Sequence, residues 1–422
     1  MTEKPSQQDQ IIRVGIVGIG AMGKGLVYQS LITAGIHCTA VADIKVERCT
    51  HFLQSLHIHY QIVHTLDEMH LAIRKGLVAV CEDGQLIAQC GMIDAFLDAS
   101  TSISEASEYA IMAIKNGKHL VLMNSELDLI LGPYLANLAK ENGVIYTSCD
   151  GDQYGVLKRL ADDLQVWGFG LVMAGNIKGF LDRSANPTSI VPEADKRNLD
   201  YKMCTSYTDG TKLCIEMALI ANALGLRTAV PGMFGPHARH VQDVFQLFDF
   251  PSLWDGKQGV VDYILGAEPG GGVFVIGYCD NKYQMDMLEY YKMGKGPFYL
   301  FYRPYHLCHI EAFSSLFNAV KDNNVFLQPD FGFQTNVFAY AKRDLRVGET
   351  LDGIGGYTCY GLIENCAEPS LDHGLPICLS DNVVLKKNIA KHQKIFLSDV
   401  QIEPGRKDFL LFQKAAALIP RK

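Results

Sequence analysis

VGIVGIGAMG, residues 14–23, is the stretch that decides the fold of the N-terminal part of the chain. The apolar run up to Val17 is typical of a buried strand, and the glycines after it follow the spacing G-x-G-x-x-G at the start of a helix. In this spacing the glycines permit a tight turn, close approach of the backbone to a pyrophosphate, and tight packing of helix on strand. The helix N-terminus adds unpaired N–H groups and a positive dipole end. The alternative is a strand–helix turn without a ligand. We predict that a dinucleotide binds at Gly18, Gly20, Ala21, Met22 and Gly23.

Asp43 stands 20 positions after Gly23. Residues 37–43 (HCTAVAD) predict a second parallel strand with this carboxylate at its end, where it would accept hydrogen bonds from the ribose hydroxyls of NAD and repel the 2′-phosphate of NADP. Lys45 and Arg48 lie close enough in sequence to offset part of that repulsion. The alternative role for Asp43 is to cap the following helix, and the two roles are compatible. The pattern favours NAD over NADP.

Composition places the chain among ordinary globular proteins. Its 422 residues exceed what one core usually supports, and the content of 48% hydrophobic and 20% charged residues is typical of an ordinary soluble globular protein. The net charge of −8 disfavours nucleic acid and anionic membranes as main partners. No apolar run is long enough to span a bilayer. Residues 1–10 are polar, predict disorder and show no secretory signal, so we expect a cytoplasmic protein with reduced cysteines.

Strands and helices alternate up to about residue 150, with short connections. This order predicts an α/β fold with a doubly wound parallel sheet of the Rossmann type. A long helix over 153–166 and a strand over 168–174 open an α+β region, in which residues 310–320 predict a helix that packs back on the nucleotide-binding domain. Short strands with glycine turns after about residue 331 predict a small β-rich module. We therefore expect domains at 1–150 (dinucleotide-binding), 151–330 (catalytic, substrate-binding and oligomerisation) and 331–422.

Polar clusters follow the predicted strands of the first domain. In open parallel sheets ligands bind beyond the carboxyl ends of the strands. The loop 100–102 is suited to pass under the nicotinamide, and the segments 124–128 and 150–153 would bring four carboxylates to one rim. Clustered carboxylates require a cation, a lysine or shared protons, or else they cap the helix expected from Gly132 and the helix after Asp150. The candidates at this edge are Ser100, Thr101 and Asn124 for the cofactor, and Glu126, Asp150 and Asp152, with Asp128, for a divalent metal.

Charged residues also stand out in the second domain. Lys178 lies in a predicted loop over 175–179, and Lys212 precedes an apolar helix over 213–224 on which Glu216 follows one turn later. Such a pair is either an ion pair at the helix edge or part of a site. Farther on, a lysine, an arginine and a histidine lie within a dozen residues and suit a phosphate or carboxylate substrate. The histidine would act as general acid or be held by local hydrogen bonds. The candidates in this domain are Lys178, Asp209, Lys212, Glu216, Lys295, Arg303 and His306.

Five blocks together resemble a family. GIVGIGAMG, GKHLVLMNSELD, DGTKLCIEMALIANALGL, GKGPFYLFYRPYHL and the final RDL…GE…LD module are similar to homoserine-dehydrogenase-like oxidoreductases with a C-terminal SAF domain, and to deoxyxylulose-phosphate reductoisomerase-like (DXR-like) enzymes. The resemblance implies NAD(P)H-dependent reduction, with a divalent cation (Mg²⁺ or Mn²⁺) in the reductoisomerase branch. It places Asn124, Glu126, Asp152, Lys178 and Lys212 at the reaction centre, and Lys295, Arg303 and His306 at the substrate.

Two departures from the reductoisomerase pattern matter. Asp43 stands where that branch has a basic stretch suited to NADP, and Gln153 stands where it has an acidic residue. Three functions remain open. The first is a simple NAD(P)-dependent dehydrogenase acting on a small polar, phosphorylated or unphosphorylated substrate, with Lys178 and Lys212 in acid–base or alkoxide-stabilising roles. The second is a reductoisomerase of 1-deoxy-D-xylulose 5-phosphate, and the third is a non-catalytic NAD sensor. We favour the dehydrogenase, as a homodimer or higher homo-oligomer.

Overall fold

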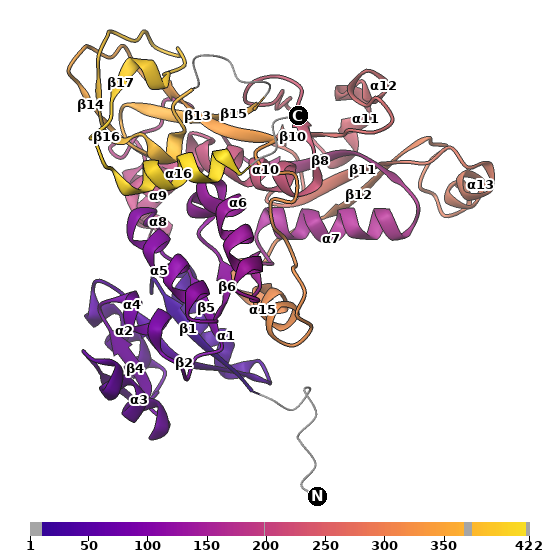
Figure 1. Ribbon diagram of the computed structural model, residues 1–422. Helices are drawn as coiled ribbons and strands as arrows, with labels where there is room; N and C mark the ends of the chain where they lie inside the picture. Colours follow the sequence, from indigo (N-terminus) through magenta and orange to yellow (C-terminus); the bar gives the residue numbers. More distant parts are fainter. Residues whose placement is uncertain (1–10, 198, 367–373, 419–422) are drawn as a thin grey trace, which may run out of the picture. The chain divides into compact units, whose positions relative to one another are not determined.

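The computed structural model describes residues 11–197, 199–366 and 374–418 (Figure 1). The disorder expected over 1–10 lies outside these residues. By its contacts the chain divides into two compact units. The first comprises residues 1–152, 307–328 and 411–422, and the second comprises 153–306 and 329–410. The chain passes from the first unit to the second after Asp152, close to the expected boundary at 150, while the division into three domains stays a prediction.

Seven strands form the sheet of the first unit, in the order β3-β4-β2-β1-β5-β6-β7, and all neighbouring pairs are parallel. This confirms the predicted Rossmann-like sheet. The strand order reverses between β1 and β5, which is where ligands bind in such sheets. The elements are β1 (Ile12–Val17), α1 (Ala21–Ile32), β2 (Ile36–Ala42), α2 (Val46–Ser55), β3 (Tyr60–Ile62), α3 (Leu66–Arg74), β4 (Val78–Cys81), α4 (Gly84–Gln89), β5 (Ala95–Asp98), α5 (Ser104–Lys115), β6 (His119–Leu122), α6 (Ser125–Glu141), β7 (Tyr146–Ser148), α14 (Cys308–Glu311) and α15 (Phe313–Val320).

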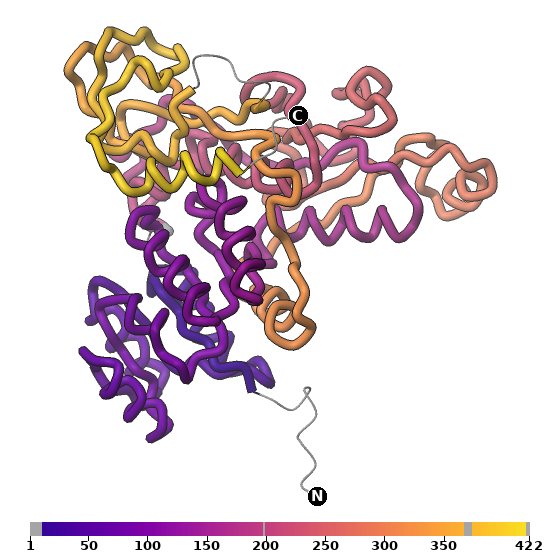
Figure 2. Tube along the Cα trace, viewed as in Figure 1, coloured from indigo at the N-terminus to yellow at the C-terminus, as the bar shows by residue number. Residues whose placement is uncertain are grey.

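The segment 307–328 completes the first unit from far along the chain, as the orange part of the trace shows (Figure 2). Leu316 joins the core formed by Val14, Ile16 and Leu97. The Thr147 hydroxyl donates a hydrogen bond of 3.1 Å to the carbonyl oxygen of Leu327. The predicted return of this helical segment to the nucleotide-binding unit is therefore confirmed.

A mixed five-stranded sheet, in the order β12-β11-β8-β10-β9, forms the core of the second unit. Helix α10 is buried along almost its whole length and packs against β10, β13, β15 and α7. The elements are α7 (Gln153–Val166), β8 (Gly170–Lys178), α8 (Val191–Arg197), α9 (Tyr201–Thr208), α10 (Thr211–Leu224), β9 (Arg227–Thr228), η2 (Val241–Asp243), α11 (Val244–Leu247), α12 (Phe250–Leu253), β10 (Val260–Leu265), β11 (Val273–Tyr278), α13 (Lys282–Tyr290), β12 (Phe298–Arg303), β13 (Thr335–Ala341), β14 (Thr350–Asp352), β15 (Cys359–Asn365), η3 (Ile377–Leu379), β16 (Asp381–Leu385), η4 (Leu397–Asp399) and β17 (Val400–Gln401).

Two small antiparallel sheets, β13-β15 and β14-β16-β17, make up the C-terminal part of the second unit. They agree with the expected β-rich module. The last helix, α16 (Lys407–Ala417), is divided between the units at Leu411. Within the described residues, none of the helices combines the length and the apolar character needed to cross a bilayer.

Two predicted boundaries were wrong. Helix α6 begins at Ser125 instead of Gly132, because the Asn124 side chain accepts a hydrogen bond from the Leu127 N–H at 3.1 Å and so caps the helix. Strand β8 continues through the expected loop to Lys178. Gly175 does not end this strand. It makes room for the Phe274 ring, whose Cζ atom would lie 2.1 Å from a Cβ at this position.

Candidate functional site

The glycine turn after β1 uses each of its three glycines differently. Gly18 has a φ of +87°, and a Cβ there would lie 2.6 Å from the Ser100 Cα atom. A Cβ on Gly23 would lie 1.9 Å from the carbonyl oxygen of Gly18. A Cβ on Gly20, in contrast, would have no atom within 4 Å. Gly18 and Gly23 are therefore needed for the turn itself, whereas Gly20 leaves open space in front of the helix.

Helix α1 begins in that open space without a cap. Gly20 is its N-cap residue and offers no side-chain hydrogen bond, while Ala21 and Met22 are exposed. The first N–H groups of a helix have no partner within the helix, and the helix dipole places partial positive charge there. A 12-residue helix that opens on a bare glycine beside free space fits a pyrophosphate. All five residues predicted to bind the dinucleotide lie in this turn.

Asp43 holds the turn in place. Its Oδ2 atom accepts a hydrogen bond of 2.8 Å from the Ile19 N–H, and its Oδ1 atom accepts one of 2.9 Å from the Lys45 N–H. The Arg48 guanidinium lies 3.8 Å from Oδ1. Asp43 follows β2, directly beside the turn, and is buried. Contact with a ribose stays a prediction, and the structure shows in addition that this carboxylate fixes the backbone of the glycine turn.

A basic hollow lies next to Asp43. It has a volume of about 370 Å³ and is lined by Lys24, Lys45, Glu47, Arg48, His51, Phe52 and Ser55. Two lysines and an arginine against one glutamate give it a positive balance. The expected preference for NAD rests on the repulsion of a 2′-phosphate by Asp43. The positive charge of this hollow reduces that repulsion.

The loop after β5 is organised by Asn124. The Asn124 amide donates hydrogen bonds to the Ser102 carbonyl oxygen at 2.7 Å and to Asp98 Oδ2 at 3.1 Å, and it lies 3.5 Å from the Ser100 hydroxyl. Asn124 is buried, whereas Thr101 is exposed at the tip of the loop. The candidates Ser100 and Asn124 thus lie together beside the glycine turn. In this position Asn124 shapes the loop that passes the turn.

Asp98 is a residue of this site that the sequence analysis missed. It ends β5, is fully buried, and accepts a hydrogen bond of 2.9 Å from the Ser100 N–H. Burial raises the pKa of its carboxyl group, and the negative charge of Glu126 adds to the shift. An aspartate that closes an apolar strand (IDAFLD) was the available signal.

The acidic rim is less uniform than expected. Glu126 lies in the first turn of α6, where a carboxylate is favoured by the helix dipole. Asp128 is buried and accepts hydrogen bonds from the hydroxyl groups of Tyr146 and Ser148. Asp150 accepts a hydrogen bond from the Gly151 N–H at 2.7 Å. Both oxygens of Asp128 thus accept hydrogen bonds from side chains of the first unit, and a metal-binding role for Asp128 stays a prediction.

The metal prediction for Glu126 and Asp152 gains no support from this geometry. Among the described residues, no group of three or more ligating side chains within 4.8 Å of one another includes Glu126. The Oδ1 atom of Asp152 lies 3.6 Å from the Cys308 thiol. A magnesium or manganese site at the acidic rim stays a prediction.

The protonation of Asp128 makes the free energy of unfolding depend on pH. Burial raises its pKa from 3.8 to about 6. Between about pH 4 and pH 6 the folded protein keeps a proton on Asp128 that the unfolded chain has lost. The contribution of this proton to the free energy of unfolding is therefore complete below about pH 4 and disappears as the pH rises to 6. We expect the free energy of unfolding of the wild type, relative to Asp128→Asn, to fall by about 3 kcal/mol between pH 4 and pH 7. Urea unfolding at several pH values measures this, and a pH-independent difference would contradict it.

Lys178 lies at the carboxyl end of β8 in the second unit. Its ammonium group donates a hydrogen bond of 2.7 Å to the carbonyl oxygen of Tyr207, near the end of α9. This contact ties the end of β8 to the junction that carries Lys212. Asn176, two residues earlier on the same face of β8, is buried and its amide nitrogen has no hydrogen-bond acceptor among the described residues. Sequence analysis did not single out Asn176.

Lys212 stands in the first turn of α10, after Gly210, whose φ of +82° forms the helix start. Lys212 and Glu216 are one turn apart on the helix and are both buried, with 8% and 5% exposure. A lysine at the positive end of a helix is unfavourable for the helix itself. Lys212 and Glu216 are thus not at the protein surface, and a reaction-centre role for Lys212 stays a prediction.

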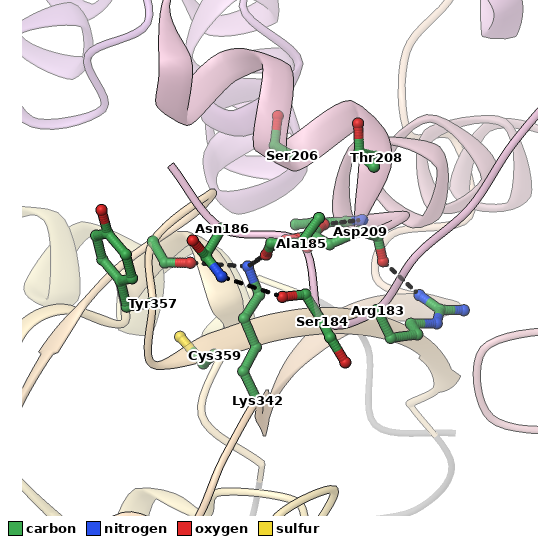
Figure 3. A network of polar contacts seen from close by, with 12 residues as sticks. Arg183, Ser184, Ala185, Asn186, Ser206, Thr208, Asp209, Lys342, Tyr357 and Cys359 are labelled. Carbon is green, nitrogen blue, oxygen red and sulfur yellow. Dashed lines mark hydrogen bonds and ion pairs between the residues drawn. The ribbon is translucent and has the colours of Figure 1, made fainter. Parts of the chain in front are cut away.

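Asp209 has a partner that lies far away in sequence. Its Oδ2 atom is 2.8 Å from the Lys342 ammonium group, and both side chains are buried (Figure 3). Lys342 also donates hydrogen bonds to the carbonyl oxygens of Ala185 and Gly356, and Arg183 donates one of 3.0 Å to the Asp209 carbonyl oxygen. Burial raises the pKa of Asp209, against the opposing effect of Lys342. The carboxylate thus joins the C-terminal module to the start of α10, and a direct contact with substrate stays a prediction.

Removal of Lys342 is expected to be costly. Lys342→Met leaves the Asp209 carboxylate buried without its counter-ion, and we expect the free energy of unfolding to fall by about 3 kcal/mol. The double variant Lys342→Met/Asp209→Asn is expected to recover more than half of that loss, because it removes the uncompensated charge. Urea unfolding of the two single variants and the double variant tests the coupling. Simple additivity of the two single effects would contradict it.

The last group of substrate candidates lies on and near the edge strand β12. Lys295 is exposed in the turn before β12. Arg303 ends β12, with its guanidinium 4.5 Å from the Tyr305 ring centroid. His306 Nδ1 is 2.7 Å from the Gly271 carbonyl oxygen. The predicted alternative for His306, a histidine held by a local hydrogen bond, therefore describes this contact, and its role as general acid stays a prediction.

Comparison with known proteins gives one family match. Residues 151–312 match the model of the catalytic domain of the oxidoreductase DRL. No curated protein matches the chain. Together with the Rossmann-like sheet and its glycine turn, the match supports an NAD(P)-dependent oxidoreductase.

Solved structures are similar only distantly. A probable dehydrogenase from Thermotoga maritima has 13% identity and a TM-score of 0.42, over 74% of this chain and 90% of that one. Scyllo-inositol dehydrogenase from Lactobacillus casei, with bound NAD(H) and scyllo-inositol, has 18% identity and a TM-score of 0.29, over 44% and 50%. DOX-P reductoisomerase in complex with magnesium has 14% identity and a TM-score of 0.33, over 49% and 56%. The chain spans about half of the latter two, and none of these likenesses carries an argument about function.

Proposed function

We propose that the protein transfers a hydride between a nicotinamide dinucleotide and the carbonyl or alcohol group of a small polar substrate, as a homoserine-dehydrogenase-like enzyme. The observation that carries this proposal is the uncapped start of α1 at Gly20, with open space in front of it, at the point where the strand order of the sheet reverses. The match of residues 151–312 to an oxidoreductase catalytic domain supports the reaction class.

Different residues of the chain are proposed to bind the cofactor, stabilise charge and orient the substrate. The N–H groups at the start of α1 bind the pyrophosphate, Asp43 holds the turn, and Asn124 shapes the loop that passes it. A nicotinamide dinucleotide, when bound there, would supply or accept the hydride. Lys178 and Lys212 supply positive charge or a proton to the oxygen on which charge develops when the carbonyl is reduced. Glu216, Lys295, Arg303 and His306 are proposed to orient the polar groups of the substrate.

A reductoisomerase of 1-deoxy-D-xylulose 5-phosphate is the second candidate. The sequence resemblance favours it, and Arg303 and Lys295 suit a phosphate. It requires a divalent cation, which we propose would bind at Glu126 and Asp152. The C-terminal β-rich module is proposed to be SAF-like. A non-catalytic NAD sensor, with that module contacting a partner, is the third candidate.

One screen separates these candidates. Oxidation of NADH and NADPH is followed with a panel of polar aldehydes and ketones, phosphorylated and unphosphorylated, with and without Mg²⁺ or Mn²⁺. The proposal expects metal-independent turnover of at least one carbonyl compound to an alcohol with the same carbon skeleton. A rearranged skeleton and a metal requirement would identify the reductoisomerase. Binding of NADH without turnover of any compound would identify the sensor and overturn the proposal.

Cofactor choice depends on the basic hollow beside Asp43. We expect NADH to be preferred, with NADPH accepted because Lys24, Lys45 and Arg48 offset the repulsion of a 2′-phosphate by Asp43. Arg48→Ala is then expected to raise the KM for NADPH about tenfold and to leave the KM for NADH within about twofold. Initial rates with each cofactor measure this. Equal effects on both cofactors would show that Arg48 acts through the fold of the glycine turn instead.

The assembly and the compartment are proposals as well. We propose a homodimer or higher homo-oligomer in the cytoplasm, without nucleic-acid or membrane partners. The net charge of −8 supports the absence of polyanionic partners. Light scattering of the purified chain tests the oligomeric state.

A further inference from the structure

A cavity lies at the amino edge of the sheet in the first unit, opposite to the edge that carries the glycine turn. It has a volume of about 320 Å³. Its walls come from the start of β1, the residues before β5, the start of β6 and the end of α15. The proposed function uses none of these residues. The lining includes Ile11, Asp94, Lys118, His119, Val320 and Lys321.

Lys118 is the unusual group in this wall. It is only 2% exposed. Among the described residues its ammonium group has no hydrogen bond or ion pair within 4 Å, and the nearby charge of Asp94 acts on it from farther away. Its backbone N–H is used, because it donates to the Ala113 carbonyl oxygen after the end of α5. A buried ammonium group without a partner costs several kcal/mol relative to water, so it either loses its proton or acquires an anion.

The other polar groups of the cavity already have partners. Asp94 accepts three hydrogen bonds from Arg13, two of them from the guanidinium group, at 2.7 to 3.1 Å. His119 Nδ1 accepts a hydrogen bond of 3.2 Å from the Ile145 N–H, and the Asn116 amide donates to the Met112 carbonyl oxygen at 2.8 Å. Arg13 pairs with Asp94, and the Asp94 charge also acts on Lys118. With Lys118 and Lys321 in the lining, the cavity keeps a positive balance.

The remaining wall is apolar. Ile12 and Ile93 are almost fully buried behind this wall, and its exposed apolar surface comes from Ile11 and Val320. An inorganic anion would satisfy Lys118 but would leave the apolar wall without contacts. A volume of about 320 Å³ is at the small end of the range for ligand sites. The chemistry therefore fits a small organic anion with one charged end and a short aliphatic tail.

We propose that this cavity binds a small aliphatic carboxylate, with the carboxylate on the Lys118 ammonium group and the tail against Ile11 and Val320. The site is separate from the predicted dinucleotide site, because it lies at the amino ends of β1, β5 and β6 while the glycine turn lies at the carboxyl ends. Burial lowers the pKa of Lys118, and an anion bound there would reverse that effect.

Binding of butyrate to the full chain, without dinucleotide, tests the proposal. Ligand-observed NMR is expected to show saturable binding of butyrate at millimolar concentrations, with weaker binding of inorganic phosphate and none of butylammonium. Lys118→Met is expected to weaken butyrate binding at least tenfold. Lys115→Met is the matched control, because Lys115 is an exposed lysine at the end of α5, three residues before Lys118, and it is expected to bind as the wild type does.

Several results would overturn the proposal. They are equal butyrate binding by Lys118→Met, binding of butylammonium as strong as that of butyrate, preference for phosphate, or no binding of butyrate up to about 50 mM. If Lys118→Met does not fold, the wild type still decides the question. Butyrate is then expected to protect Lys118, but not Lys115, from reductive methylation, as measured by mass spectrometry, and absence of protection would overturn the proposal. Neither measurement depends on turnover, so the proposed oxidoreductase activity stands or fails separately.

Discussion

Gly20→Val is expected to lower the affinity for NADH and NADPH about a thousandfold, equivalent to about 4 kcal/mol, while the protein stays folded. A Cβ at this position meets no atom of the protein within 4 Å, and the backbone has an extended conformation (φ −77°, ψ −157°) that valine adopts readily. Valine is a poorer N-cap residue than glycine, which costs about 1 kcal/mol of stability. The side chain would instead occupy the space in which the pyrophosphate meets the start of α1. Fluorescence titration with each dinucleotide measures the loss.

Two other glycines provide the controls for this prediction. A Cβ on Gly91 would also have no atom within 4 Å, and this glycine lies at the opposite edge of the sheet, so Gly91→Val is expected to bind the dinucleotide normally. Gly23→Ala is expected to destabilise the protein, because its Cβ would lie 1.9 Å from the Gly18 carbonyl oxygen. If Gly20→Val binds within about threefold of the wild type, the glycine turn is not the pyrophosphate site.

Most of the first unit could be predicted because its pattern is local. The end of β1 at Val17 agrees with the sequence analysis, and so do the bounds of α7 in the second unit, since both are apolar or amphipathic runs between clear end signals. The errors at α6 and β8 have local causes too. In both elements a glycine resembles an end signal, although Asn124 starts α6 much earlier and Gly175 lies inside β8 to accommodate the Phe274 ring.

The candidate site was predictable only in part. The glycine turn and Asp43 follow from spacing, and the carboxyl-end rule brought Ser100 and Asn124 to the same loop region. Local sequence contains no sign that Lys342 is the partner of Asp209, because 133 positions separate them. Burial is equally invisible in the sequence. Asp128 and Lys118 look like surface charges there, and only the packing of the sheet shows that both are enclosed.

Lys212→Ala is expected to lower kcat about a thousandfold and to leave dinucleotide affinity unchanged. Lys212 is buried at the positive end of α10, where its charge is unfavourable for the helix, and Lys178 is tied to the same junction through the Tyr207 carbonyl oxygen. Such a charge stabilises an oxygen that becomes negative during reduction, so its loss should appear in kcat more than in KM.

The Lys212 experiment uses the best carbonyl substrate from the screen. Lys282→Ala is the matched control, since Lys282 is 85% exposed on α13 of the same unit, and it is expected to keep full activity. Because alanine leaves space where the lysine was, added propylamine is expected to restore part of the lost rate, which a purely structural role for Lys212 would not allow. Lys178→Ala is expected to lower kcat as well, by about a hundredfold. If Lys178→Ala and Lys212→Ala both retain full turnover with their folds intact, neither lysine acts on the reacting oxygen.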